Sequence, residues 1–400
     1  MIFPLYCKYQ LLIIVAIIGL NFSELIACTS FTVYVDSGNI LYGMNFDYPE
    51  VEMKLSITAN DTIKFFHLQF YNNGFYSSTV GMNSNGFFSS CQMLYPEVNE
   101  WHYPGEKEID IGNLYYYSLI SCDSAESIIQ YFNITDTKLI HTYGITLHDI
   151  FADKYGNSFV MEVGDTNPLI TEIQNNFLVM SNFPNSDFEG QPYTNVTGVG
   201  AQRYKDAYKY ISDNLAGFDI SDGIETLKRT IQSSGGYKTQ CSFLFDPVNL
   251  EIYIIIKRDF DKIRKVDLVN KTIETYAGFD LYEKFNIDAD GILVSELENV
   301  ATSKESNLSY NGFKRAYKNY PNPFNKYVNI EFVLNSSDFV SVEIFDSYGQ
   351  KVKTIINDIL NSGRYNFKWH PEKLKSGVYY SRLTVGDKVK TYKILYLDNY

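Results

Sequence analysis

The sequence predicts an α+β protein in which a four-layer αββα part is followed by a small all-β sandwich. Two blocks of short strands alternate with two pairs of helices over residues 28–300, and this order is typical of two facing sheets with helices outside them. A polar stretch at residues 301–318 interrupts the hydrophobic patterning, and alternating strands resume over residues 319–400. We interpret the polar stretch as a linker between the two parts.

Residues 1–27 have the layout of a secretory signal peptide. Lys8 precedes the apolar run LLIIVAIIGL, and the more polar NFSELIA follows it. The apolar run is too short to span a bilayer, and the rest of the chain has no apolar run long enough to do so. We therefore expect an exported, extracellular or cell-surface protein whose mature chain begins at Cys28.

The first strand block and the first helix pair follow directly. Phe31, Val33 and Val35 alternate with polar residues, and NSNG at residues 83–86 supplies a later turn. The residues at helical spacing that follow are Ile111, Leu114, Tyr115 and Leu119. Asp123 and Glu126 then form the pattern of a capping box at the start of a second helix.

The second strand block contains GITLHDIFADKYGNSFVMEV and LITEIQNNFLVMSNF. A second helix pair is expected over residues 201–215 and 222–233, with Asp222 and Glu225 as the capping box of the latter helix. The strands TQCSFLFD and EIYIIIKRDF close this part. In the tail, five to seven short strands separated by Gly-containing turns predict the sandwich.

Composition excludes several classes of function. The formal net charge of −13 argues against nucleic acid as a partner, because phosphate binding needs a basic surface. The cysteines are too few and too scattered for a disulfide scaffold. The sequence contains neither CxxC nor HExxH, so we expect no metal site and no cofactor.

Cys28 is the candidate nucleophile. If it begins the mature chain, its thiol and a free α-amine share one carbon, and the amine, which titrates near pH 7.7–8.0, can take the thiol proton. Two other interpretations stay open at this point. Leu25 to Cys28 also fit a bacterial lipoprotein pattern, in which this cysteine is lipidated, and Cys28 could be an ordinary structural cysteine.

Residues 28–300 resemble the choloylglycine hydrolase and penicillin V acylase family of N-terminal nucleophile amidases. Cys28-Thr29 and the segment Gly43-Met44-Asn45-Phe46-Asp47 match the family's Cys-Thr start and its Gly-Arg-Asn-x-Asp segment. The resemblance implies that Asp47 holds the amine of the nucleophile. Met44 replaces the family arginine that lies beside the thiol, which removes a cation that favours thiolate.

Further segments extend this resemblance. VMSN at residues 179–182, followed by Phe-Pro, is similar to the family segment whose asparagine binds the reacting carbonyl, which implies this role for Asn182. GVGAQRYKDAYKY resembles the segment with the second active-site arginine, here Arg203, and Thr239-Gln240-Cys241-Ser242 resembles the family's Thr-Gln-x-Ser strand. The oxyanion residue of the family aligns with Met93, which cannot donate, so Gln92 or a backbone N–H is expected to serve.

The tail from residue 319 resembles the C-terminal sorting domain of the type-nine secretion system. YPNPF, the Tyr-Gly-Gln hairpin, LKSGVYY and the closing KILYL strand carry this resemblance. It implies that the bacterial secretion machinery is a partner of the tail.

Together the resemblances imply a secreted hydrolase of linear, non-peptide amides that acts on a small-molecule acyl amide. The alternatives are an acyltransferase, a catalytically degenerate or lipid-anchored surface binding protein on the same fold, and a papain-like enzyme that uses Cys91 and His148. Loss of activity in Cys28→Ala separates the main hypothesis from the binding-protein and papain-like alternatives.

Overall fold

The structure is a computed structural model. It describes residues 28–397 except for residues 36–37, 73, 99–100, 280, 299–316, 335–336, 348, 373 and 387. The expected signal peptide and most of the expected linker lie outside the described residues. Contacts divide the chain into two units, the first comprising Met1–Lys271 with Ile287–Asn299 and the second Thr272–Asn286 with Val300–Tyr400.

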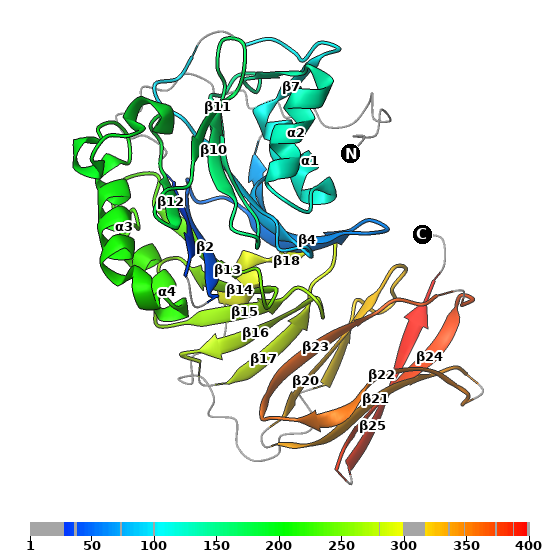
Figure 1. The fold of residues 1–400 in the computed structure, drawn as a ribbon. Coiled ribbons are helices and arrows are strands. Elements are labelled where there is room, and N and C mark those ends of the chain that lie inside the picture. The colour runs from blue at the N-terminus through cyan, green and yellow to red at the C-terminus, as the bar shows by residue number, and fades with distance from the viewer. Residues whose placement is uncertain are drawn as a thin grey trace. The chain divides into compact units, whose positions relative to one another are not determined.

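The first unit contains two antiparallel sheets, which we call sheet one and sheet two (Figure 1). In spatial order, the strands of sheet one are β12 (Phe177–Met180), β1 (Thr29–Tyr34), β2 (Ile40–Asp47), β13 (Thr239–Asp246), β14 (Glu251–Ile256) and β15 (Ile263–Asp267). Those of sheet two are β11 (Leu169–Glu172), β10 (Ser158–Glu162), β9 (Leu147–Ala152), β6 (Phe88–Met93), β5 (Phe75–Asn83), β4 (Lys64–Asn72), β3 (Met53–Ala59) and β18 (Ile292–Leu293). The central strands β1, β2 and β6 are buried almost throughout, as expected for strands covered on both faces.

The two sheets pack face to face. Aromatic contacts join them, with ring centroids 5.1 Å apart for Tyr42 and Phe88, and polar contacts also cross between them, as with the Thr32 and Ser158 hydroxyls at 2.9 Å. The interface between the sheets is therefore partly polar, and the hydrogen bonds that cross it satisfy polar groups that would otherwise be buried without partners.

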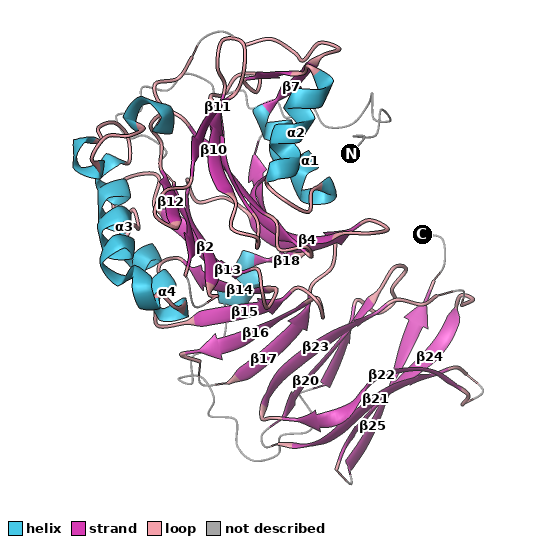
Figure 2. Cartoon of the chain, in the orientation of Figure 1, coloured by secondary structure: helices cyan, strands magenta, loops and turns pink. Residues whose placement is uncertain are grey.

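Helices cover the outer face of each sheet (Figures 1 and 2). α1 (Ile111–Ser121) and α2 (Glu126–Thr135) share a core with sheet two, and α3 (Ala201–Asn214) and α4 (Ile220–Arg229) share a core with sheet one. The order is helix, sheet, sheet, helix, so the predicted four-layer αββα fold is confirmed. The remaining elements of this unit are β7 (Glu108–Asp110), β8 (Lys138–Ile140), α5 (Val294–Glu298) and the short 3-10 helices η1 (Asn185–Phe188), η2 (Tyr193–Asn195) and η3 (Leu215–Gly217).

Both predicted capping boxes are wrong in position. α4 begins at Ile220, and its capping box joins Asp219 and Asp222 rather than Asp222 and Glu225. α2 follows Ala125, which makes no side-chain cap bond, while Asp123 accepts a bond from the Ser127 hydroxyl at 3.2 Å. The helices themselves are present, but α4 starts at a capping box three residues before the predicted one, and α2 starts without a side-chain cap.

The second unit is built from two sheets. One has the order β16 (Thr272–Ala277), β17 (Tyr282–Asn286), β23 (Gly363–Trp369), β20 (Val328–Leu334) and β19 (Tyr317–Tyr320). The other has the order β22 (Lys351–Leu360), β21 (Asp338–Phe345), β24 (Gly377–Val385) and β25 (Lys388–Tyr396). Val328, Ile330, Phe332 and Leu334 alternate inward as the sequence pattern predicts, and they share a core with Val340, Val342 and Ile344 of the other sheet.

β16 and β17 precede the expected linker yet belong to the second unit, because β17 pairs in parallel with β23. The sequence boundary at residue 300 stays a prediction. Among the described residues, no helix has the length and apolar character needed to cross a membrane.

Candidate active site

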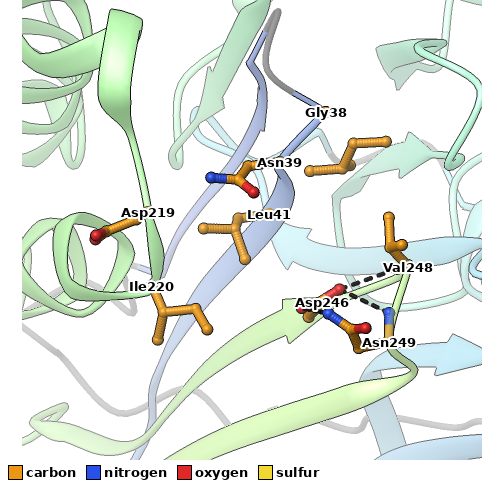
Figure 3. Close-up of a pocket in the computed structure, with 9 residues that line it drawn as sticks. Gly38, Asn39, Leu41, Asp219, Ile220, Asp246, Val248 and Asn249 are labelled. Carbon is orange, nitrogen blue, oxygen red and sulfur yellow. Dashed lines mark hydrogen bonds between the residues drawn. The ribbon is translucent and has the colours of Figure 1, made fainter.

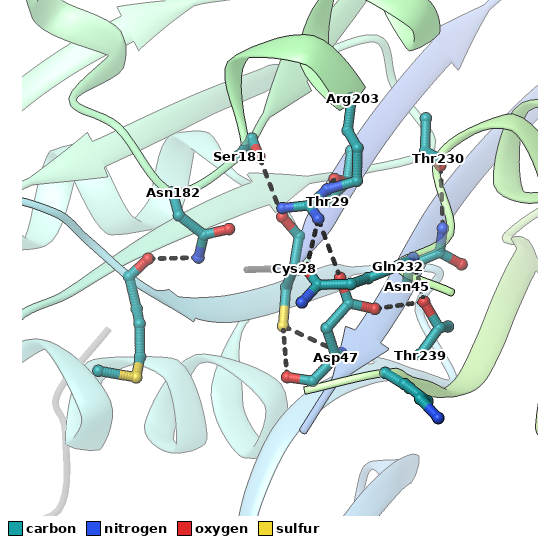
Figure 4. A network of polar contacts seen from close by, with 12 residues as sticks. Cys28, Thr29, Asn45, Asp47, Ser181, Asn182, Arg203, Thr230, Gln232 and Thr239 are labelled. Carbon is teal, nitrogen blue, oxygen red and sulfur yellow. Dashed lines mark hydrogen bonds and ion pairs between the residues drawn. The ribbon is translucent and has the colours of Figure 1, made fainter. Parts of the chain in front are cut away.

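Cys28 lies immediately before β1 and is 4% exposed. Its Sγ accepts a hydrogen bond from the backbone N–H of Asp47 at 3.4 Å and lies 3.8 Å from the Asp47 carbonyl oxygen (Figure 4). β1 and β2 are antiparallel neighbours in which Thr29 pairs with Asn45. This pairing holds the thiol against the end of β2.

The Asp47 carboxylate is fully buried beside Cys28. One of its oxygens accepts a hydrogen bond from the Thr239 hydroxyl at 2.5 Å, and the other lies 3.7 Å from Nη1 of Arg203. Burial raises the pKa of Asp47 to about 8, although the Arg203 charge and the Thr239 hydrogen bond act in the opposite direction. Burial also raises the pKa of the Cys28 thiol, and the nearby Asp47 charge raises it further.

Arg203 projects from the first turn of α3 into the site. Its Nε donates to the Thr29 hydroxyl at 3.3 Å and its Nη1 donates to the Gln232 side chain at 2.7 Å, while Nη2 is buried without a hydrogen-bond partner among the described residues. Thr29 adjoins the candidate nucleophile, so Arg203 contacts both Asp47 and the start of β1. The structure therefore brings together three of the predicted site residues, Cys28, Asp47 and Arg203.

Gly200 allows the start of α3 to lie close to Ser181, beside Cys28. It precedes α3 with φ of 78°, a left-handed conformation, and a Cβ there would lie 2.0 Å from the Ser181 hydroxyl oxygen. That hydroxyl donates to the carbonyl oxygen of Cys28 at 3.1 Å. Any larger residue at position 200 would displace either Ser181 or the start of α3.

Asn182 lies on the other side of Cys28. β12 pairs with β1 so that Met180 faces Ser30, and continuing this register by two residues places Asn182 next to Cys28. The Asn182 side-chain N–H donates to the Met93 carbonyl at 2.6 Å, whereas its side-chain oxygen is buried and has no partner in the described part of the chain. A second N–H of the amide stays available to an oxygen in the site.

Gln92 comes from β6 of sheet two. Its amide nitrogen donates to the Ser30 hydroxyl at 2.5 Å, and that hydroxyl lies 3.0 Å from the Ser90 hydroxyl. Gln92 therefore contacts the residue two positions after Cys28. Its assignment as an oxyanion donor stays a prediction.

Met44 is completely buried and pairs with Ser30 on one side and with Phe243 on the other. Paired residues point to the same face of a sheet, so Met44 shares the face of Ser30, and that of Cys28 two residues before it. The cation that pairs with Asp47 is Arg203. A second arginine, Arg258, donates to the Thr239 carbonyl and also lowers the pKa of Asp47.

Sequence reasoning did not assign roles to Thr239 and Gln232, which bind Asp47 and Arg203. Thr239 is the first residue of the Thr-Gln-x-Ser segment, and this motif was the sequence pattern that could have indicated it. Gln232 lies in the stretch between α4 and β13, and no sequence pattern indicated it.

A papain-like pair of Cys91 and His148 does not fit the structure. In the pairing of β6 with β9, Cys91 faces Asp149 and Gln92 faces His148. Neighbouring residues of a strand point to opposite faces. Cys91 belongs to the core shared with α1 and α2, whereas the amide of its neighbour Gln92 reaches Ser30 in sheet one.

A cavity of about 290 Å³ lies apart from these residues (Figure 3). Asn39, Leu41, Asp219, Ile220 and Asp246 line part of it. The Asp246 carboxylate accepts hydrogen bonds from the backbone of Val248 and Asn249, so it closes a turn. Within the described part of the chain, no group of three His, Cys, Asp or Glu residues is arranged to hold a metal ion.

Comparison with known proteins identifies the tail. Residues 318–396 match the family model of the secretion system C-terminal sorting domain. This match confirms the resemblance predicted for the tail, and the protein is exported to the cell surface or the extracellular space. The sorting domain implies an interaction with the secretion machinery.

Solved structures similar to the chain include a penicillin V acylase and a conjugated bile acid hydrolase. Penicillin V acylase from Agrobacterium tumefaciens is 15% identical, with 66% of this chain and 96% of that chain covered and a TM-score of 0.49. A single-residue variant of conjugated bile acid hydrolase from Clostridium perfringens is 15% identical, with 62% of this chain and 97% of that chain covered and a TM-score of 0.47. No curated protein matches the chain.

Proposed function

We propose that the protein is a secreted hydrolase of linear, non-peptide amides whose nucleophile is Cys28 at the start of the mature chain. The observation that carries the proposal is the convergence on Cys28 of a buried carboxylate, Asp47, and a partly buried guanidinium, Arg203. Burying a carboxyl and a guanidinium beside a thiol costs desolvation free energy, and groups perturbed in this way cluster at functional sites.

Removal of the residues before Cys28 would create an α-amine next to Asp47. An α-ammonium beside this carboxylate would lower the pKa of Asp47 below the value of about 8 that holds without it. The pair of Asp47 and the α-amine would then exchange a proton with the thiol near neutral pH. Arg203 and Thr239 would keep Asp47 in position for this task.

In the proposed reaction, the neutral α-amine takes the thiol proton and sulfur attacks the amide carbonyl. The resulting oxyanion accepts the free N–H of Asn182 and a donor near Gln92. The leaving amine receives the proton from the α-ammonium as the C–N bond breaks. Water then attacks the thioester by the same route, which releases the acid and restores the thiol.

The proposed substrate is an amide with a bulky or lipid-like acyl group. Penicillin V and a glycine-conjugated bile acid are suitable first probes, since the resemblance of residues 28–300 to the choloylglycine hydrolase and penicillin V acylase family implies substrates of these kinds. Acyl-homoserine lactones and acyl-amino acids complete the panel.

Two measurements on exported protein test the proposal. Intact-mass analysis is expected to give a chain that begins at Cys28 with a free amine, and Cys28→Ala is expected to abolish turnover of every amide in the panel. A diacylglyceryl mass on Cys28, or turnover that survives Cys28→Ala, would falsify this function. A lipid-modified cysteine would favour a surface binding protein instead.

A further inference from the structure

We infer that His148 and Glu162 form a positioning pair that holds the segment from Asn182 to Ser186, and so aims the Asn182 amide at the reacting carbonyl. This inference rests on the proposed function, because it concerns the residue that would bind the oxyanion. Neither residue belongs to the set predicted around Cys28, and both lie in sheet two, opposite the strand from which Asn182 extends.

Glu162, the last residue of β10, is almost completely buried. One carboxylate oxygen accepts the backbone N–H of Asn185 at 2.7 Å, and the other accepts the backbone N–H and the hydroxyl of Ser186 at 3.2 and 2.6 Å. His148 Nδ1 lies 3.2 Å from the first oxygen. Burial by itself raises the pKa of Glu162, but these hydrogen bonds and the histidine bring it below its ordinary value.

These four contacts occupy the carboxylate, which accepts about four hydrogen bonds when ionised. Glu162 is therefore not available as a general base. Its donors belong to one short segment of backbone and to His148, so its effect is to fix that segment. An ionised carboxylate held by backbone N–H groups is also a stronger anchor than a neutral acceptor.

The segment that Glu162 holds crosses from sheet one to sheet two. Its first end is fixed in β12, where the Asn185 side chain also donates to the Val179 carbonyl at 2.9 Å. Its other end is fixed by Glu162 in β10. Asn182 lies between these two anchors, and its own backbone carbonyl accepts the N–H of Tyr95 at 2.9 Å.

His148 supports Glu162 from the neighbouring strand β9 and is completely buried. Because an ionised carboxylate has no proton to donate, Nδ1 of His148 is the donor. Nε2 is buried and meets no partner among the residues that the structure describes. Gln92 is the register partner of His148, so a row of polar side chains runs across sheet two from Gln92 through His148 to Glu162.

Hydrogen exchange tests the positioning role without any substrate. In Glu162→Gln, exchange at the Asn185 and Ser186 amides is expected to rise at least about tenfold, because a neutral amide is a weaker acceptor for them. Exchange at the Tyr95 amide is expected to rise with them, although this N–H donates to the Asn182 carbonyl and not to Glu162. If Tyr95 exchange stays unchanged while the other two rise, Glu162 does not control Asn182 and the inference fails.

Kinetics on an amide that the wild-type protein hydrolyses provides the second test. Asn182→Ala and Glu162→Gln are each expected to lower kcat, while iodoacetamide labels Cys28 at the wild-type rate, since labelling forms no oxyanion. The double variant is expected to be no slower than Asn182→Ala alone. If the losses of kcat in the two single variants multiply in the double variant, the inference is contradicted. Labelling of Cys28 that falls in parallel with kcat would contradict it as well.

Two variants of His148 separate positioning from general destabilisation. His148→Asn keeps a nitrogen donor near the position of Nδ1 and is expected to retain most of the activity, whereas His148→Leu is expected to resemble Glu162→Gln. Ser158→Ala is the matched control, because it removes a buried hydrogen bond between the sheets, from the same strand as Glu162, without touching this segment. If no amide in the panel is hydrolysed, the proposed function fails, while the exchange result still decides the positioning role.

Discussion

The two sides of Cys28 differ in the kind of polar group that they present. On one side, Asp47 faces the charge of Arg203 and accepts a hydrogen bond from the Thr239 hydroxyl. On the other side, Asn182 and Gln92 are neutral amides whose side-chain oxygens are buried and find no partner within the described ranges. The charged side is suited to hold an α-amine and move a proton. On the amide side, the second N–H of each amide, and not the unpartnered oxygen, is the group suited to meet charge on a substrate oxygen.

The largest effect that distinguishes the two sides is expected from Asp47→Asn. It removes the charge that would hold the α-amine and leaves Arg203 without its carboxylate partner. We expect kcat/KM to fall by about 10²–10⁴, the range typical of general acid–base groups, and the pH dependence of iodoacetamide labelling at Cys28 to change with it. Asp246→Asn is the matched control, since Asp246 is a largely buried carboxylate of β13 that closes a distant turn.

The amide side is expected to respond differently. Asn182→Ala removes the proposed oxyanion donor and is expected to lower kcat by about 10²–10³ without changing the labelling of Cys28. Asn83→Ala is the control, because Asn83 is also a buried amide that donates to backbone carbonyls, here those of Leu119 and Cys122. If iodoacetamide labelling of Cys28 fell equally in the Asp47 and Asn182 variants, the proposed difference between the two sides would be wrong.

Stability against pH provides a third test of the charged side. Without a free amine at Cys28, the pKa of Asp47 is raised by burial to about 8 in the folded protein, against about 3.9 in an unfolded chain. A carboxyl with a raised folded pKa stabilises the fold at low pH, and this contribution is lost as pH rises from about 4 to about 8, by roughly 1.4 kcal/mol for each unit of pKa separation.

Protein that keeps residues before Cys28 is therefore expected to lose stability over that pH range. Protein that begins at Cys28 is expected to lose less, because its α-ammonium favours the ionised Asp47. Urea unfolding of both forms across this range measures the difference. Identical pH profiles would mean that the α-amine does not reach Asp47.

The charged side was easier to predict from sequence than the contacts that support it. Cys28 directly precedes β1 and Asp47 ends β2 of the same hairpin, so two short motifs close together in the sequence contain them. Gln232 reaches the site only through long-range packing, which leaves no local pattern. The start of α4 was misplaced for a related reason: Asp219 with Asp222 and Asp222 with Glu225 are both capping patterns, and tertiary packing, in which Gly223 lies against Leu244, decides between them.

The amide side was predicted only in part. Asn182 followed from its motif, but neither Glu162 nor His148 carries a sequence signal for holding the segment after it, because Glu162 contacts residues 23 and 24 positions later in the chain. β16 and β17 were not expected as strands, and the pairing of β17 with β23, which groups them with the second unit, joins residues too far apart in sequence to leave a local pattern.

Met44→Arg is expected to have the smallest effect, and it tests whether charge can be added to the thiol's own face of sheet one. Met44 is buried between Ser30 and Phe243 on that face, so an arginine there would lie near Sγ. An opposite charge within about 4–6 Å lowers the pKa of an acidic group by roughly 1–3 units. We expect the pKa that governs iodoacetamide labelling of Cys28 to fall by about this amount, and the acid limb of kcat/KM to move to lower pH with it.

Met44→Gln is the control for this variant, because it adds polarity of similar size without charge and is expected to leave the labelling pKa near that of the wild-type protein. The larger arginine is expected to press on Phe243, so circular dichroism and thermal unfolding must first establish that the variant is folded. An unchanged labelling pKa in folded Met44→Arg protein would mean that residue 44 does not act on the thiol, and that burial and the other groups around Sγ, Asp47 and Arg203 among them, set its ionisation.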